Sequence, residues 1–275
     1  MKLAVVLITA LSLSSLFLAE ADATPKGKKI AFLVTSPTHP FIATLSKTFV
    51  SRANAFGMEV NTVSQHFDAA LQAQQVDDAI ARQFDMLAII AGSEQAIVPA
   101  LTRAKQAGVP VILINSPPRD GSEDLYLSFV GEDHVELGRI TGVSVLQGLK
   151  EGGRDGGKIA LITGSLQEGV GPRRVAGFRE AMKANPKAQI VAVEDAKWQT
   201  DLSERIAGQL FARFAAQGGL DVVYGITQVP TRTGLKAAEM IADHFNGKTL
   251  PKNEILPVET ITKANVDKWE EACSY

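Results

Sequence analysis

The stretch KIAFLVTSPTHPF at residues 29–41 decides the fold of this chain. Residues 29–34 form a nearly continuous apolar run, which is typical of a β-strand covered by helices on both faces. Pro40 suits the first turn of a helix. Apolar residues then recur at helical spacing up to Gly57, where we expect the helix to end. The stretch therefore predicts a strand, a polar loop and a helix in succession.

The same alternation of apolar strands and amphipathic helices continues along the chain. A first series has predicted strands at 58–63, 86–90 and 109–115, with a helix opened by Asp68 and another at 96–107. A second series follows the segment 126–131, with helices at 135–149, 173–184, 202–216 and 231–245 and strands at 158–163, 189–193, 220–226 and 254–259. Such alternation predicts parallel sheets with helices on both faces. We therefore expect an α/β fold with two similar, doubly wound lobes.

The first 23 residues carry the pattern of an export signal. Lys2 precedes an uncharged run over 3–19, and the small residues Ala21 and Ala23 stand where a signal peptidase reads. The run is short for a membrane-spanning helix, and an uncleaved anchor is the alternative. We expect a signal peptide over 1–23, cleavage near Ala23 and a periplasmic protein.

The charge balance favours neither a nucleic acid nor a membrane surface as a partner. The chain has 28 basic and 30 acidic residues and a formal net charge of −2, whereas such partners require a basic surface. The single cysteine, Cys273, cannot form a disulfide within the chain. We expect it to be a buried thiol or a residue that has lost its partner.

Polar segments follow the predicted strands, where open parallel sheets bind ligands. They lie at 35–41, 91–95, 115–118, 163–171, 194–200 and 225–230. They contain no Gly-x-Ser-x-Gly motif, and the four histidines are scattered without metal-ligand spacing. The segment GGRDGGK at 152–158 imitates a phosphate loop, but Ile159 stands where Ser or Thr is needed, and a strand follows it instead of a helix. We predict a binding protein that is not an enzyme and uses no cofactor or metal.

Several segments together resemble the type I periplasmic sugar-binding proteins, the ribose- and galactose-binding class. The resemblance rests on the leader, residues 30–42 and 87–116, RVAGF at 174–178, Trp198 and TQVP at 227–230, and it covers nearly the whole mature chain. It implies two α/β lobes joined by three crossings, with a sugar or polyol held between them. It also implies an ABC transporter permease as the partner, and we expect a monomer.

The resemblance places ligand contacts in both lobes. Those of the first lobe fall on Thr35, His39, Phe41, Ile42, Asn115 and Ser116, and those of the second on one of Arg173 and Arg174, on Trp198 and on Gln228 at a crossing. Aromatic rings stack on the apolar faces of sugars, while guanidinium and amide groups pair with hydroxyls. The alternatives are structural: Phe41 or Trp198 in a core, and Arg174 in an ion pair with Glu180.

The chain departs from the family pattern at three positions. Many relatives have an asparagine where His39 stands, and often an Asp-Arg pair where Asn115-Ser116 stands, so a carboxylate acceptor for hydroxyls is missing. After the strand at 220–226 the chain passes directly to the crossing, where the family has about fifty further residues, more than one βαβ unit. We expect a second lobe shortened near 225–226, with apolar surface exposed. The expected lobes are 24–129 with 229–254, and 130–228 with 255–275.

The solute-binding subunit of a sugar ABC importer is the leading functional interpretation. A periplasmic sensor subunit that presents a bound sugar to a membrane receptor or kinase uses the same closing motion and is the alternative, as is a truncated form with impaired binding. An effector-binding domain of a lactose-repressor-type regulator shares the fold. The leader, and the lack of a helix-turn-helix before Lys29, argue against that regulator.

Overall fold

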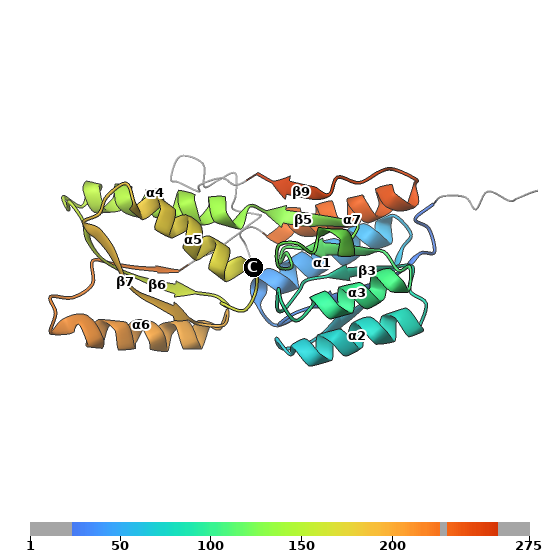
Figure 1. Ribbon diagram of the computed structural model, residues 1–275, viewed down its shortest axis with the longest axis horizontal. Helices are drawn as coiled ribbons and strands as arrows, with labels where there is room; N and C mark the ends of the chain where they lie inside the picture. The colour runs from blue at the N-terminus through green and yellow to red at the C-terminus, as the bar shows by residue number, and fades with distance from the viewer. Residues whose placement is uncertain (1–23, 226–229, 258–275) are drawn as a thin grey trace, which may run out of the picture.

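Two parallel sheets stand side by side in the computed structural model, which describes residues 24–225 and 230–257 (Figure 1). The strands are β1 (Lys29–Val34), β2 (Glu59–Ser64), β3 (Met86–Ile89), β4 (Val111–Ile114), β5 (Ser128–Glu132), β6 (Gly157–Thr163), β7 (Ala188–Asp195), β8 (Val222–Gly225) and β9 (Asn253–Leu256). The helices are α1 (Pro40–Ala55), α2 (Ala69–Ala81), α3 (Val98–Gln106), α4 (His134–Glu151), α5 (Val170–Met182), α6 (Thr200–Ala215) and α7 (Pro230–Phe245), with a short 3-10 helix at Glu123–Leu125. The sheet orders are β2-β1-β3-β4-β5-β9 and β7-β6-β8. The predicted α/β fold with two doubly wound lobes is confirmed.

The first lobe is built around β1, as its apolar run predicts. Ile30 and Phe32 pack with α1 and α7 on one face, whereas Ala31 and Leu33 pack with α2 and α3 on the other. The Phe32 ring lies 4.3 Å from the ring of Phe49 in α1, between ring centroids. Because both faces are covered, the strand has no polar side and no alternating pattern.

The second lobe repeats this arrangement on a smaller sheet. Ile159 and Leu161 of β6 pack beneath α4 and α5, and Ala160 and Ile162 pack on α6. This sheet has three strands among the described residues, against six in the first lobe, in agreement with the predicted shortening. The side chains of β8 are only partly buried, which is consistent with its position at the edge of the sheet.

Some expected features fall outside the described residues or have different bounds. The leader, the junction at 226, Gln228 and Cys273 are not described. Helix α5 begins at Val170 instead of residue 173, because Pro172 lies in its first turn, where no backbone N–H is needed. Strand β9 ends at Leu256. No helix of the described part is long and apolar enough to cross a membrane.

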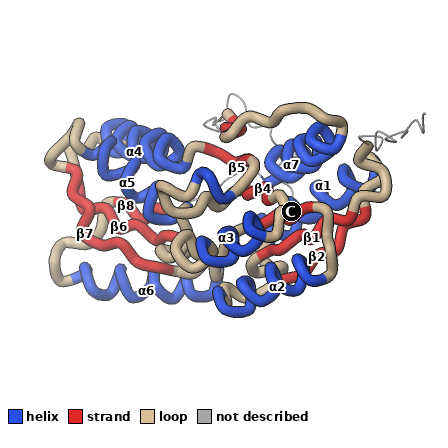
Figure 2. The backbone as a smooth tube through the Cα atoms, turned by 45° about the vertical axis from the view of Figure 1, so that its right-hand side comes forward, coloured by secondary structure: helices blue, strands red, loops and turns tan. Residues whose placement is uncertain are grey.

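Helices α4 and α5 approach closely enough to require glycine at their contact. A Cβ atom on Gly138 would lie 1.9 Å from the carbonyl oxygen of Arg174, and one on Gly177 would lie 1.8 Å from that of Val135. Both obstacles are backbone atoms, so neither moves without shifting a whole helix. Figure 2 shows that α4 directly follows β5, the strand from which the chain crosses between the lobes. The contact therefore sets the position of α5 relative to the crossing.

Gly138→Ala and Gly177→Ala are each expected to lower the free energy of unfolding by at least about 1–3 kcal/mol, the usual cost of overpacking. Gly148 provides a matched control in α4, because no atom of the described residues lies within 4 Å of its added Cβ. Gly148→Ala should raise stability by about 0.5–1 kcal/mol through the better helix propensity of alanine. Urea unfolding followed by circular dichroism measures all three. Wild-type stability in Gly138→Ala would contradict the close contact.

Candidate functional site

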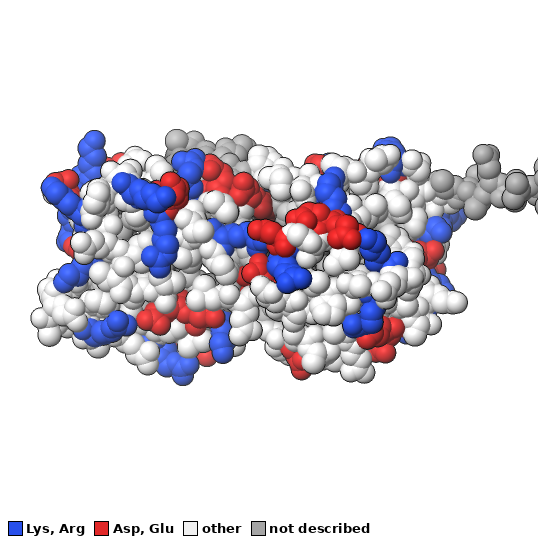
Figure 3. Space-filling model, in the orientation of Figure 1, with Lys and Arg blue, Asp and Glu red and all other residues white. Residues whose placement is uncertain are grey.

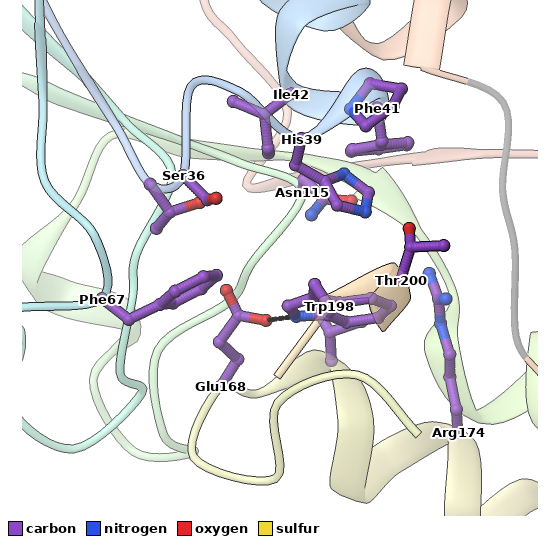
Figure 4. Close-up of a pocket in the computed structure, with 13 residues that line it drawn as sticks. Ser36, His39, Phe41, Ile42, Phe67, Asn115, Glu168, Arg174, Trp198 and Thr200 are labelled. Atoms are coloured by element: carbon purple, nitrogen blue, oxygen red, sulfur yellow. Dashed lines mark hydrogen bonds between the residues drawn. The ribbon is translucent and has the colours of Figure 1, made fainter. Parts of the chain in front are cut away.

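A cavity of about 240 Å³ lies between the two lobes, at the carboxyl ends of their strands (Figure 4). The first lobe lines it with Thr35, Ser36, His39, Pro40, Phe41, Ile42, Phe67 and Asn115, and the second with Glu168, Val170, Arg174, Trp198 and Thr200. The described segments of the first lobe contribute no permanently charged side chain, whereas the second lobe contributes a carboxyl group and a guanidinium. On the face shown in Figure 3, basic and acidic residues are interspersed.

Most residues expected to contact a ligand line this cavity. They are Thr35, His39, Phe41, Ile42, Asn115, Arg174 and Trp198. Ser116 is buried but is not among the lining residues. Six lining residues were not predicted individually: Ser36, Pro40, Phe67, Glu168, Val170 and Thr200. Ser36, Pro40, Glu168, Val170 and Thr200 lie in segments expected to follow strands, so their place on the sheet edge was predicted and their orientation was not.

Arg174 is the central polar side chain of the site and is only 1% exposed. Its Nε donates to Nδ1 of His134 at 3.3 Å, and Nε2 of His134 lies 2.7 Å from the Asn115 carbonyl oxygen. Burial and the nearby Arg174 cation lower the pKa of His134 to about 3, so the imidazole is neutral and carries its proton on Nε2. A hydrogen-bonded chain thus joins α5 of the second lobe to the end of β4 in the first.

The guanidinium of Arg174 retains an unused donor. Burial lowers its pKa to about 10, against the opposing influence of Glu132 and Glu168, so it stays cationic at neutral pH. Its Nη2 is buried and has no hydrogen-bond partner within residues 24–225 and 230–257. A buried donor without a partner costs roughly 1–3 kcal/mol. A ligand oxygen in the cavity would remove that cost.

Trp198 forms one wall of the cavity from a tight turn. Lys197 and Trp198 both have left-handed backbone conformations, with φ of 50° and 59°, which are uncommon for residues other than glycine. The indole Nε1 donates to Oε2 of Glu168, and the His39 ring meets the indole edge-on, 6.2 Å between centroids. A Cβ atom on Gly164 would lie 2.0 Å from the indole ring, so this position must lack a side chain.

Arg173 lies at the rim of the site and is not among the cavity-lining residues. Its Nη1 is 2.8 Å from Oε2 of Glu94, and its Nη2 is 2.8 Å from Oδ1 of Asp120. Both acidic residues belong to the first lobe, after β3 and β4. Arg173 therefore bridges the two lobes, while its neighbour Arg174 faces the cavity.

The chemistry of the site is that of binding. Within residues 24–225 and 230–257, no group of three or more His, Cys, Asp or Glu side chains is placed to hold a metal ion. The aromatic side chains Phe41, Phe67 and Trp198 offer apolar faces, and Asn115, Glu168 and Arg174 offer polar groups. Apolar walls with few polar groups are typical of a small-molecule site.

Gly164→Ala is expected to displace the indole of Trp198 while the lobes stay folded. The only other tryptophan, Trp269, can be replaced by phenylalanine so that fluorescence reports Trp198 alone. The displaced ring should gain exposure to water, and its emission maximum should move to longer wavelength. Gly208→Ala in α6 is the matched control, since its added Cβ meets no atom within 4 Å in the part of the chain that the structure describes. An emission maximum that is the same in all three proteins would contradict the packing of Trp198 on Gly164.

Comparisons with known proteins agree with this architecture. A D-ribose/D-allose-binding protein of Pseudomonas aeruginosa is 27% identical over 216 residues, which are 76% of this chain and 66% of that protein. The ribose import binding protein of Bacillus subtilis (strain 168) is 28% identical over 167 residues, or 61% of this chain and 52% of the relative. The matched regions thus span about half to two thirds of these relatives.

A solved structure supports the fold over a longer part of the chain. The periplasmic binding protein component of the arabinose ABC transporter from Shewanella sp. ANA-3, bound to α- and β-L-arabinofuranose, superposes with a TM-score of 0.78 at 16% identity. The superposition covers 90% of this chain and 96% of that one. Residues 30–250 match the periplasmic binding protein domain, and the chain belongs to that family.

Proposed function

We propose that this chain is a solute-binding protein that captures a sugar or a sugar-like polyol between its two lobes. The proposal is carried by one observation: Arg174 lines the interlobe cavity, and its buried Nη2 has no hydrogen-bond partner among the described residues. A hydroxyl or ring oxygen of a sugar would accept this hydrogen bond, and charge-assisted bonds of this kind are the strong ones. The same cavity places the indole of Trp198 where a sugar face would stack.

The relatives support a sugar as the ligand class. Those described above bind D-ribose or D-allose, import ribose, or hold L-arabinofuranose. We infer that this chain, too, serves an ABC importer, that it acts as a monomer, and that its first 23 residues direct export to the periplasm and are removed near Ala23. Closure of the lobes over the ligand would present the closed protein and its sugar to a membrane permease. We infer that the chain divides into the two lobes that its sequence predicts.

The shortened second lobe bears on how the cavity closes. The cavity-lining residues of that lobe come from the loop after β6, from α5, from the loop after β7 and from the start of α6. All four segments belong to the part of the lobe that the chain retains. The bridge from Arg173 to Glu94 and Asp120 supplies a contact across the cleft at its rim. These features support a site that closes despite the smaller sheet.

A thermal-shift and calorimetry panel of D-ribose, D-allose, D-galactose, D-fucose and L-arabinose tests the proposal. At least one sugar is expected to raise the melting temperature and to bind in a one-to-one complex. Arg174→Lys should weaken the binding of that sugar about tenfold or more, because lysine keeps the charge but lacks the planar set of donors that the guanidinium has.

Arg139→Lys is the matched control, since it makes the same change in an exposed arginine of α4 that pairs with Glu136 and lies outside the cavity. Lysine can keep that ion pair, and exposed pairs contribute little, so affinity should change by less than about fivefold. A folded wild-type protein that responds to none of these sugars, nor to glycerol or inositols, would overturn the assignment of a sugar or polyol ligand.

A further inference from the structure

Glu168 is a buried acid that the proposed function does not yet use. It lies in the loop between β6 and α5, is only 4% exposed and lines the cavity. Figure 4 shows one carboxyl oxygen bonded to the indole nitrogen of Trp198 and the other directed into the space bounded by Ser36, Phe67 and His39. One end of the carboxyl group is thus held by the protein, and the other is available to a ligand.

The surroundings of Glu168 favour its neutral form. Burial raises its pKa to about 8; the indole hydrogen bond and the Arg174 cation oppose this rise, and the Asp195 carboxylate adds to it. The Arg174 cation lowers the pKa of Glu168 only in part, because it also interacts with Glu132. Val170 and Phe67 add apolar surface around the cavity. These surroundings therefore favour the carboxylic acid form of Glu168 at neutral pH.

The other charged or titratable groups nearby do not replace this role. His39 lines the same cavity, and burial lowers its pKa, so it is neutral near pH 7. His134 is neutral as well, as its pKa of about 3 requires. Glu94 approaches the neighbouring Gly169 but is paired with Arg173. Glu168 is thus the acidic side chain among the lining residues of the described chain.

We propose that Glu168 contacts the ligand as a carboxylic acid, donating a hydrogen bond to a sugar oxygen, and so contributes to the choice of sugar. This inference rests on the proposed function and deepens it. With its acceptor oxygen held by Trp198, the acid offers its O–H to the cavity, as Arg174 offers Nη2. The second lobe thereby presents two donors, and it selects sugars whose oxygens lie within reach of both.

The direction in which sugar affinity changes with pH follows from the protonation of Glu168, because only the protonated acid can donate a hydrogen bond. Below pH 8 the acid is mostly protonated and can donate; above pH 8 it is mostly carboxylate and cannot. If only the acid form binds, affinity should fall about tenfold between pH 6.5 and 9.0, since each pH unit above the pKa removes a factor of ten of the acid. Arg174 stays mostly cationic over this range, because its pKa is about 10.

Three proteins test the proposal by calorimetry at pH 6.5 and 9.0: wild type, Glu168→Gln and Glu168→Leu. The probe is whichever of the five sugars named above binds the wild type most tightly, and the other four measure selectivity. Glutamine keeps the shape of glutamic acid, with an oxygen for Trp198 and an amide donor for the cavity. Leucine has similar size and no donor. Melting curves show that each variant is folded.

We expect Glu168→Leu to bind at least tenfold more weakly at pH 6.5 and to lose part of the preference among the five sugars. Glu168→Gln should recover most of that affinity, within about fivefold of wild type, and should not weaken at pH 9.0. If Glu168→Leu destabilises the lobe, the loss of pH dependence in Glu168→Gln tests by itself whether the acid form of Glu168 donates to the sugar.

Equal losses in the glutamine and leucine variants would overturn the donor role, since they would show that the carboxylate is the contacting form. Unchanged affinity and selectivity in Glu168→Leu would overturn any ligand contact by this residue. A folded wild type that binds no sugar or polyol is a different result, because it overturns the proposed function itself.

Discussion

The buried guanidinium of Arg174 is the constraint on which the site depends. A cation removed from water is stable in a protein only where hydrogen bonds and opposite charges surround it. His134 accepts a hydrogen bond from its Nε, and Glu132 is the first of the acidic groups that support its charge against burial. Its position in turn requires α5 to lie against α4, which the glycines at 138 and 177 permit. The packing of α5 against α4 therefore determines where the Arg174 charge lies in the second lobe.

The two lobes contribute different chemistry to one cavity. The first lobe, with six strands, supplies aromatic, aliphatic and neutral polar side chains, whereas the smaller second lobe supplies the guanidinium and the carboxyl group. The cavity persists beside a three-stranded sheet because its second-lobe residues follow β6 and β7 or lie on α5 and α6. Glu168 and Trp198 are joined by a hydrogen bond, and Arg174 is bonded to His134 of α4, so these contacts come from described segments other than β8.

The fold was largely predictable because its signals are local. The apolar run of β1, Pro40 at the start of α1 and Gly57 after it each act through neighbouring residues. The site was less predictable, as Arg173 and Arg174 illustrate. Successive residues on a helix point about 100° apart, so one reaches the cavity and the other bridges the lobes. Nothing in the sequence says which of the two faces inward.

Hydrophobic periodicity is a property of adjacent residues, so it is enough to predict the order of strands and helices, and hence which segments lie at the ligand-binding edge of each sheet. Packing between distant segments is what places Glu168 against Trp198, His134 beneath Arg174 and Arg173 across the cleft. Protonation of the buried acid likewise depends on burial by segments far apart in the chain. Desolvation and long-range contacts exist only after the lobes have packed, so no reading of neighbouring residues could contain them.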